Sequence, residues 1–147
     1  MNRIRTLWGN RRPGQKMLVP FFTAGYPDLA TSVELVRAAV VAGADMIEVG
    51  MPFSDPLADG PSIQFSSHIA LQNGVNLKGI LGAVAELCRT VDTPIILMGY
   101  FNPLLVYGLE RFLRDARQAG VDGLIIPDLP VDEAGEYRKA ATANYIS

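Results

Sequence analysis

The segment Ile47–Gly60, whose sequence is IEVGMPFSDPLADG, contains the two carboxylates of this chain that are best placed for chemistry. Glu48 lies inside a short apolar run that predicts a buried strand. Asp59 lies at the far end of the following loop, which is interrupted by proline and glycine. A carboxylate is costly to bury unless it is paired or takes part in chemistry, so we expect function to centre on this segment.

Both carboxylates also have a structural interpretation. Glu48 could be bonded to backbone or hydroxyl groups. Asp59 could cap the helix that is expected to begin near Ser62, a role that is compatible with catalysis. The only histidine, His68, is interpreted as a helix-surface or packing residue, and the only cysteine, Cys88, as a small hydrophobe in a helical pattern. These single residues do not obviously supply a structural zinc site or a Ser-His-Asp triad, so we expect no metal.

The composition narrows the class of protein. The chain has 147 residues, a formal net charge of −2 and 49% apolar residues, enough to form a core. No basic run is interleaved with aromatic residues, so we expect no nucleic-acid partner. The basic segment 3–16 lacks the apolar core of a secretory signal, and no stretch approaches the roughly 20 apolar residues of a membrane span. One cysteine allows no intrachain disulfide, which fits a cytoplasmic protein.

Apolar runs alternate with helical periodicities along the chain. We expect strands at 18–23, 46–49, 94–100 and 124–127, and helices at 28–43, 62–72, 77–89, 109–119 and 131–145, with a loop or turn around 102–103. The strands are continuous apolar runs, which indicates burial on both faces and a parallel sheet. Strands that alternate with helices indicate a single α/β domain over residues 1–147.

A faint internal repeat is present, because AGADMI at 42–47 recurs as AGVDGL at 119–124. Such a repeat is common in β/α barrels, although a doubly wound sheet could also show it. Both architectures place function at the carboxyl ends of the strands. The polar residues gather at those ends: Glu48, Asp59, Tyr100, Asn102 and Asp128.

A complete barrel of eight units needs about 250 residues, whereas this sequence predicts four units. We therefore expect a half barrel. Its sheet would have an open edge on each side and an exposed apolar concave face, features that invite pairing with another chain.

The segment Ile47–Gly60 closely resembles the signature of the tryptophan synthase alpha subunit family, whose fold is a (β/α)₈ barrel. The resemblance runs from about Pro20 onward in the family's order and spacing. The other matching runs are PFFTAGYP at 20–27, GP with IQ at 60–64, LMGYFNP at 97–103 and DLP with Glu133 at 128–133.

The resemblance implies a lyase of tryptophan biosynthesis that cleaves indole-3-glycerol phosphate into indole and glyceraldehyde 3-phosphate. This retro-aldol reaction protonates indole C3 and removes the proton of the neighbouring side-chain hydroxyl. Glu48 would serve both steps if desolvation raises its pKa towards neutrality. Asp59 would stabilise the positive charge that develops at the indole N–H.

By the same resemblance, other positions bind substrate or a partner subunit. The substrate-binding positions are Phe21, Ile63, Met98, Tyr100 and Ile125, and the apolar ones could equally be ordinary barrel core. The positions that contact the beta subunit in an alpha2-beta2 assembly are Pro52, Asp55, Pro56 and Asn102, which could also be ordinary loop residues. The beta subunit carries pyridoxal phosphate, so we expect no cofactor in this chain.

The family's phosphate-binding glycine loops lie late in the barrel and have no counterpart in these 147 residues. We therefore expect the chain alone to be inactive. One alternative is a non-catalytic half-barrel module for binding or assembly. Another is a relative of indole-glycerol-phosphate synthase, but that enzyme would need a catalytic lysine on an early strand, and the four expected strands contain none.

Overall fold

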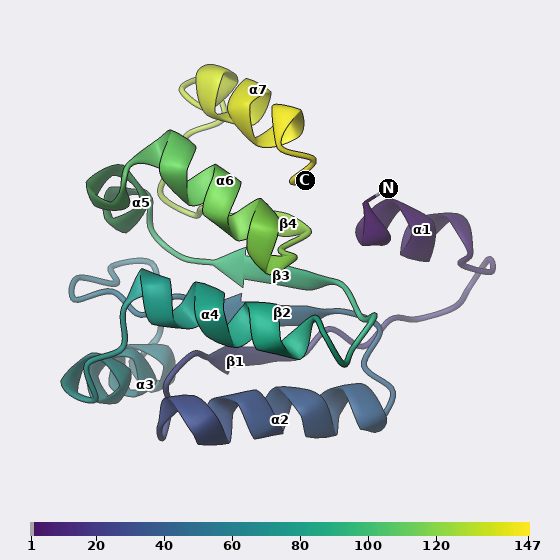
Figure 1. Cartoon of the computed structure of the whole chain (residues 1–147), viewed down its shortest axis with the longest axis horizontal. Helices are drawn as coiled ribbons and strands as arrows, with labels where there is room; N and C mark the ends of the chain where they lie inside the picture. Colours follow the sequence, from purple (N-terminus) through teal and green to yellow (C-terminus); the bar gives the residue numbers. More distant parts are fainter. Residues whose placement is uncertain (1) are drawn as a thin grey trace.

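The computed structural model describes residues 2–147 as one parallel sheet of four strands flanked by helices (Figure 1). The strands are β1 (Phe21–Thr23), β2 (Ile47–Gly50), β3 (Ile95–Met98) and β4 (Gly123–Ile125). The helices are α1 (Arg3–Gly9), α2 (Leu29–Val41), α3 (Pro61–Gln72), α4 (Leu77–Leu87), α5 (Phe101–Tyr107), α6 (Leu109–Ala119) and α7 (Gly135–Ala143).

The strand order β1-β2-β3-β4 identifies the architecture. Each strand pairs in parallel with the one before it, and helices connect them. A doubly wound sheet would reverse its order at a switch point, whereas a barrel adds its strands in sequence. The α/β prediction is confirmed, and the chain provides four β/α units, which is half of a (β/α)₈ barrel.

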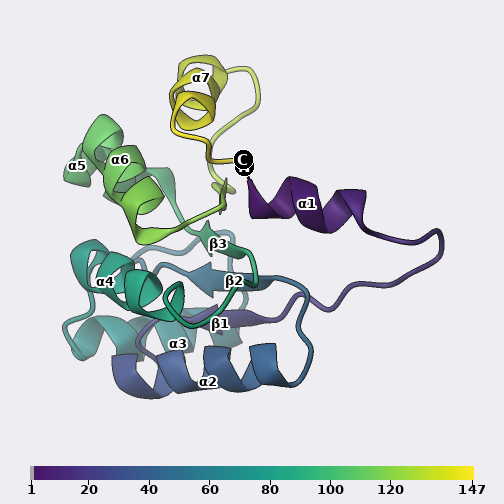
Figure 2. The same cartoon turned by 45° about the vertical axis from the view of Figure 1, so that its right-hand side comes forward.

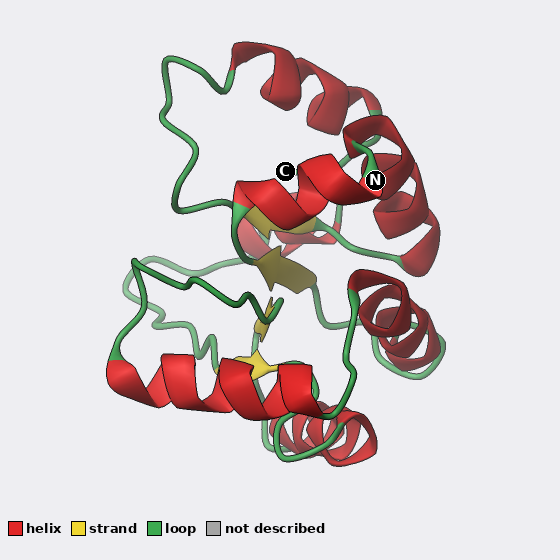
Figure 3. Cartoon of the chain, turned by 90° about the vertical axis from the view of Figure 1, so that its left-hand side faces the viewer, coloured by secondary structure: helices red, strands yellow, loops and turns green. Residues whose placement is uncertain are grey.

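One face of the sheet packs against α2, α4 and α6. Figure 3 shows a column of helices along one side of the strands. In the sheet, Ile47, Ile95 and Leu97 are completely buried, and Val49 is nearly so. They share a single core cluster with residues of the three helices, among them Val36, Val84, Phe112 and Leu113. The continuous apolar runs of β2 and β3 therefore supply this core with every second residue.

Two helices differ from the sequence-based expectations. The loop expected around Asn102 and Pro103 is the helix α5, whose first turn accommodates the proline because the amide that proline lacks is unpaired there anyway. The helix α1 was not expected, and it begins where the Asn2 side chain accepts a hydrogen bond from the Ile4 amide. In addition, β1 begins at Phe21 rather than at residue 18.

The internal repeat has a structural basis. Gly43 and Gly120 both have positive φ, at 99° and 91°, and each ends a helix. Two residues later, Asp45 and Asp122 each accept a hydrogen bond from a backbone amide that lies at the start of a neighbouring strand or shortly before it. The Asp45 carboxylate accepts from Leu18 N at 2.7 Å, and the Asp122 carboxylate accepts from Ile95 N at 3.0 Å. The repeat therefore marks the turn by which a helix returns to the sheet.

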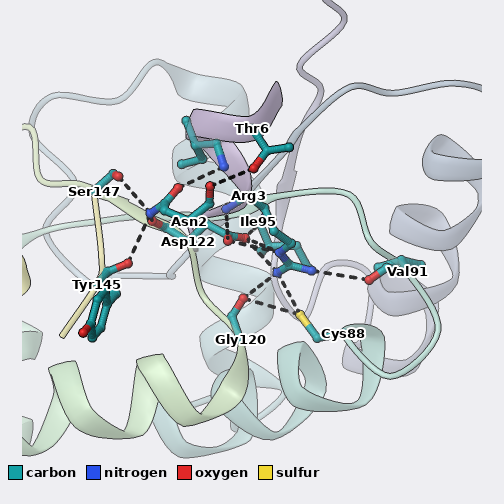
Figure 4. Close-up of polar contacts among 11 residues, drawn as sticks. Asn2, Arg3, Thr6, Cys88, Val91, Ile95, Gly120, Asp122, Tyr145 and Ser147 are labelled. Carbon is teal, nitrogen blue, oxygen red and sulfur yellow. Dashed lines mark hydrogen bonds and ion pairs between the residues drawn. The ribbon is translucent and has the colours of Figure 1, made fainter. Parts of the chain in front are cut away.

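The helix α1 lies at the amino ends of the strands, opposite α3 and α5 (Figure 1). Its Arg3 side chain contacts Asp122 of the β4 approach, the Gly120 carbonyl and Cys88 at the end of α4 (Figure 4). Asn2 donates to the Ser147 hydroxyl at 2.9 Å, so the start of α1 lies beside the last residue of the chain (Figure 2).

Cys88 is half-buried and packs against the core cluster, in agreement with its interpretation as a small hydrophobe. His68 is exposed on α3, as a helix-surface residue would be. Within residues 2–147, we find no helix with the length and apolar character that crossing a membrane requires.

Candidate active site at the carboxyl ends of the strands

The register of the sheet places Glu48 on the face opposite the helix-packed core. Glu48 pairs with Phe21 of β1 on one side and with Ile96 of β3 on the other. Met98 in turn pairs with Ile125 of β4. Because side chains alternate along a strand, these five residues share the inner, concave face of the sheet. The structure thus brings together four of the expected site residues, Phe21, Glu48, Met98 and Ile125.

The Glu48 carboxylate stands in a mainly apolar strand. Its neighbours Ile47 and Val49 are buried against the helices, while Glu48 itself is half-buried. Within residues 2–147, its side chain has neither a hydrogen-bond partner nor an ion-pair partner. A purely structural carboxylate would need such partners. Glu48 is therefore free to face a molecule bound on the concave side.

Glycine at position 50 makes room for the ring of Phe21. Any side chain at Gly50 would collide with that ring, and a Cβ there would lie 2.8 Å from Cε2. The aromatic ring consequently lies across β2, two residues beyond Glu48 in the strand. This contact gives the concave face a flat apolar surface next to the carboxylate.

The loop that carries Asp59 is held by a side chain from the next strand. The Ala58 amide donates to the Tyr100 hydroxyl at 2.9 Å, and the Asp59 amide donates to the Pro56 carbonyl at 3.0 Å. The expected capping role of Asp59 is not seen. The N-cap of α3 is Gly60, followed by Pro61, and no side chain caps it.

Tyr100 is buried at the end of β3, with 6% of its surface exposed. Its ring lies 5.2 Å from that of Phe53 in the same loop. Burial raises the pKa of the Tyr100 hydroxyl, and the nearby negative charges of Asp59 and Asp128 raise it further, although the bond from Ala58 acts in the opposite direction. The hydroxyl therefore gives up its proton less readily than that of an ordinary tyrosine.

The remaining expected positions surround this centre. Ile63 is half-buried in the first turn of α3, and Ile125 is 36% exposed at the end of β4. Of the residues expected to contact a partner, Asp55 and Asn102 are exposed, while Pro52 and Pro56 are half-buried. They lie in the β2–α3 loop and at the start of α5, which emerge from the same end of the sheet (Figure 1).

Sequence reasoning assigned no role to Asp128, which follows β4. Its carboxylate accepts a hydrogen bond from the Phe101 amide at 2.9 Å and so joins the β4 loop to α5. The sequence signals were its position after a strand and its place in the DLP run at 128–130. Among residues 2–147, no group of three or more histidine, cysteine or acidic side chains is arranged to hold a metal ion.

Comparison with known proteins extends these observations. A family model described as tryptophan synthase alpha chain matches residues 9–147. The tryptophan synthase alpha chain of Citrifermentans bemidjiense is 52% identical over 141 residues, which cover 95% of this chain and 53% of that relative. This chain thus spans about half the length of the curated relatives that it matches.

Solved structures agree with the fold. The tryptophan synthase alpha subunit of Legionella pneumophila superimposes with a TM-score of 0.95 at 40% identity, over 99% of this chain and 56% of that one. A chain from the tryptophan synthase a2b2 complex of Pyrococcus furiosus superimposes with a TM-score of 0.85 at 42% identity, over 88% of this chain and 52% of that one.

Proposed function

This chain belongs to the tryptophan synthase alpha chain family, and on that premise we propose that it supplies the catalytic carboxylates for cleaving indole-3-glycerol phosphate. The products are indole and glyceraldehyde 3-phosphate. The observation that carries the proposal is the position of Glu48. It is an unpaired carboxylate, within residues 2–147, on the concave face of the sheet beside an aromatic ring.

Glu48 is the proton shuttle in this proposal. It gives a proton to indole C3 and takes the proton of the side-chain hydroxyl next to the breaking bond, so the carboxyl ends the cycle as it began. The Phe21 ring beside it and the apolar side chains of Met98 and Ile125 offer a surface for the indole ring. Ile63 in α3 completes this apolar group.

Asp59 acts on the indole nitrogen. As C3 gains a proton, the ring develops positive charge and its N–H becomes more acidic, so an ionised carboxylate nearby lowers the energy of that state. The bond from the Ala58 amide to the Tyr100 hydroxyl fixes the backbone next to Asp59. Tyr100 thus supports the substrate site through its contact with the loop.

The partner in this proposal is a tryptophan synthase beta subunit, which would carry the pyridoxal phosphate and receive the indole. The exposed Asp55 and Asn102, with Pro52 and Pro56, form its contact surface, and all four lie at the active end of the sheet. A related chain that occurs in an a2b2 complex supports this assignment. Phosphate binding is assigned to the half of the relatives that this chain does not span.

The experiment measures indole release from indole-3-glycerol phosphate. A polypeptide of these 147 residues is assayed alone, and again after fusion to the carboxyl-terminal half of the Citrifermentans bemidjiense relative. We expect turnover only from the fusion, and a loss of at least about 100-fold in kcat for Glu48→Gln or Asp59→Asn. Glu110→Gln on the exposed face of α6 is the matched control and should leave the rate unchanged. Full activity of the Glu48→Gln fusion would overturn the assignment.

A further inference from the structure

The helix α5 begins without a capping side chain of its own. Its N-cap residue is Tyr100, whose side chain makes no capping hydrogen bond. The missing acceptor comes from Asp128, 27 residues further along the chain, which accepts from the Phe101 amide at 2.9 Å. A carboxylate at this position also interacts favourably with the helix dipole. The start of α5 is therefore held by the loop after β4.

This bond continues the pairing of β3 and β4 beyond the sheet. The last backbone link there joins the Gly99 amide to the Ile125 carbonyl at 3.0 Å. After it, Asp128 and Phe101 provide the next connection between the two loops. The Phe101 ring also packs edge-on against Tyr137 of α7, with ring centres 5.8 Å apart. Position 101 is thus fixed through both its backbone and its side chain.

Tyr100, directly before Phe101, extends the connection in the other direction. Its hydroxyl accepts from the Ala58 amide, and its ring packs on Phe53. A shift of residues 100–101 would therefore move the hydroxyl that holds the backbone beside Asp59. Burial and the nearby negative charges of Asp59 and Asp128 also raise the pKa of that hydroxyl.

We propose that Asp128 is a positioning residue of the active site, because its bond to Phe101 fixes Tyr100, and Tyr100 in turn fixes the loop of Asp59. Three loops, which follow β2, β3 and β4, are thereby joined into one unit. Asp128 acts through Tyr100 and does not itself touch the reacting atoms. The proposal rests on the proposed function, since it gives Asp59 a position that matters for catalysis.

The test measures solvent exchange of individual amides in the ¹⁵N-labelled chain by NMR, with no substrate present. In Asp128→Ala we expect the amides of Phe101 and Ala58 to exchange about fivefold faster, because each hydrogen bond contributes about 1 kcal/mol. Asp128→Asn keeps an acceptor oxygen and should restore both rates. Asp132→Ala, an exposed residue in the same loop, is the matched control and should change neither rate.

Tyr100→Phe tests the hydrogen bond from the Ala58 amide to the Tyr100 hydroxyl. It should speed exchange at Ala58 to the same extent, and combining it with Asp128→Ala should add nothing further at Ala58. The amide of Leu97, in the centre of β3, reports whether each variant remains folded. If Asp128→Ala loses that protection, Asp128→Ser takes its place, since a serine side chain is too short to reach Phe101.

The proposal would be overturned if the Phe101 amide exchanged faster in a folded Asp128→Ala variant while the Ala58 amide kept the parent rate. Asp128 would then be only a local cap. Exchange needs no turnover, so this outcome is distinct from a failure of the lyase assignment. That failure would be seen as full activity of the Glu48→Gln fusion with the exchange pattern intact.

Discussion

The Arg3 guanidinium lies 2.7 Å from the Asp122 carboxylate and joins the first helix to the approach of the fourth strand. Asp122 is buried, with 5% of its side-chain surface exposed, and it also accepts from the Ile95 amide of β3. Arg3 donates further to the Gly120 carbonyl, and the ion pair with Asp122 raises its pKa against the opposing effect of burial. One carboxylate thus connects α1, β3 and β4.

Asp122→Ala should lower the free energy of unfolding by about 3 kcal/mol, because it leaves a partly buried guanidinium and a strand amide without their partner. The measurement is urea denaturation followed by circular dichroism. Asp45→Ala is the matched control. Asp45 occupies the equivalent place in the internal repeat but bonds to a single backbone amide, that of Leu18, so its loss should cost about 1 kcal/mol. Equal losses in the two variants would contradict the role given to Arg3.

Gly50→Ala should destabilise the protein by about 1–3 kcal/mol, because the added methyl group meets the Phe21 ring on the concave face. The same substitution at Gly82, an exposed position in α4 with open space around it, should be neutral or slightly stabilising, since alanine favours a helix. Thermal unfolding of both variants makes the comparison. A Phe21→Leu change should relieve part of the defect of Gly50→Ala, and its failure to do so would place the strain elsewhere.

Local patterns in the sequence account for most of the sheet and for Glu48. Continuous apolar runs predicted β2 and β3, and the alternation of side chains in β2 is enough to set Glu48 apart from Ile47 and Val49. The two helices that the sequence did not predict, α5 and α1, depend on contacts between residues far apart in the chain. The helix α5 is capped by Asp128 from another loop, and α1 is held by Arg3 across 119 residues of sequence. No local pattern contains such information.

The Asp28 cap of α2 should make stability depend on pH. The Asp28 carboxylate accepts from the Thr31 amide at 2.8 Å and from the Thr31 hydroxyl at 2.7 Å, and these bonds hold its pKa below the ordinary value. A carboxylate with a lowered pKa stabilises the folded state above its unfolded pKa, about 3.9, and loses that contribution as the pH falls further. The urea midpoints of the parent and of Asp28→Ala should therefore differ at pH 6 and converge towards pH 3. Asp132→Ala, whose side chain is exposed, should show no such convergence.

Tyr137→Phe should raise the free energy of unfolding by about 1 kcal/mol. The hydroxyl of Tyr137 in α7 is buried and has no hydrogen-bond partner within residues 2–147, and its burial raises its pKa. Removing a buried hydroxyl that lacks a partner relieves its desolvation cost, whereas removing a bonded one loses a contact. Tyr107→Phe provides the contrast, because the Tyr107 hydroxyl donates to Asp115 at 2.9 Å, and its loss should lower stability by about 1 kcal/mol. Urea denaturation of both variants should therefore give shifts of opposite sign, and a destabilised Tyr137→Phe would mean that this hydroxyl is bonded in solution.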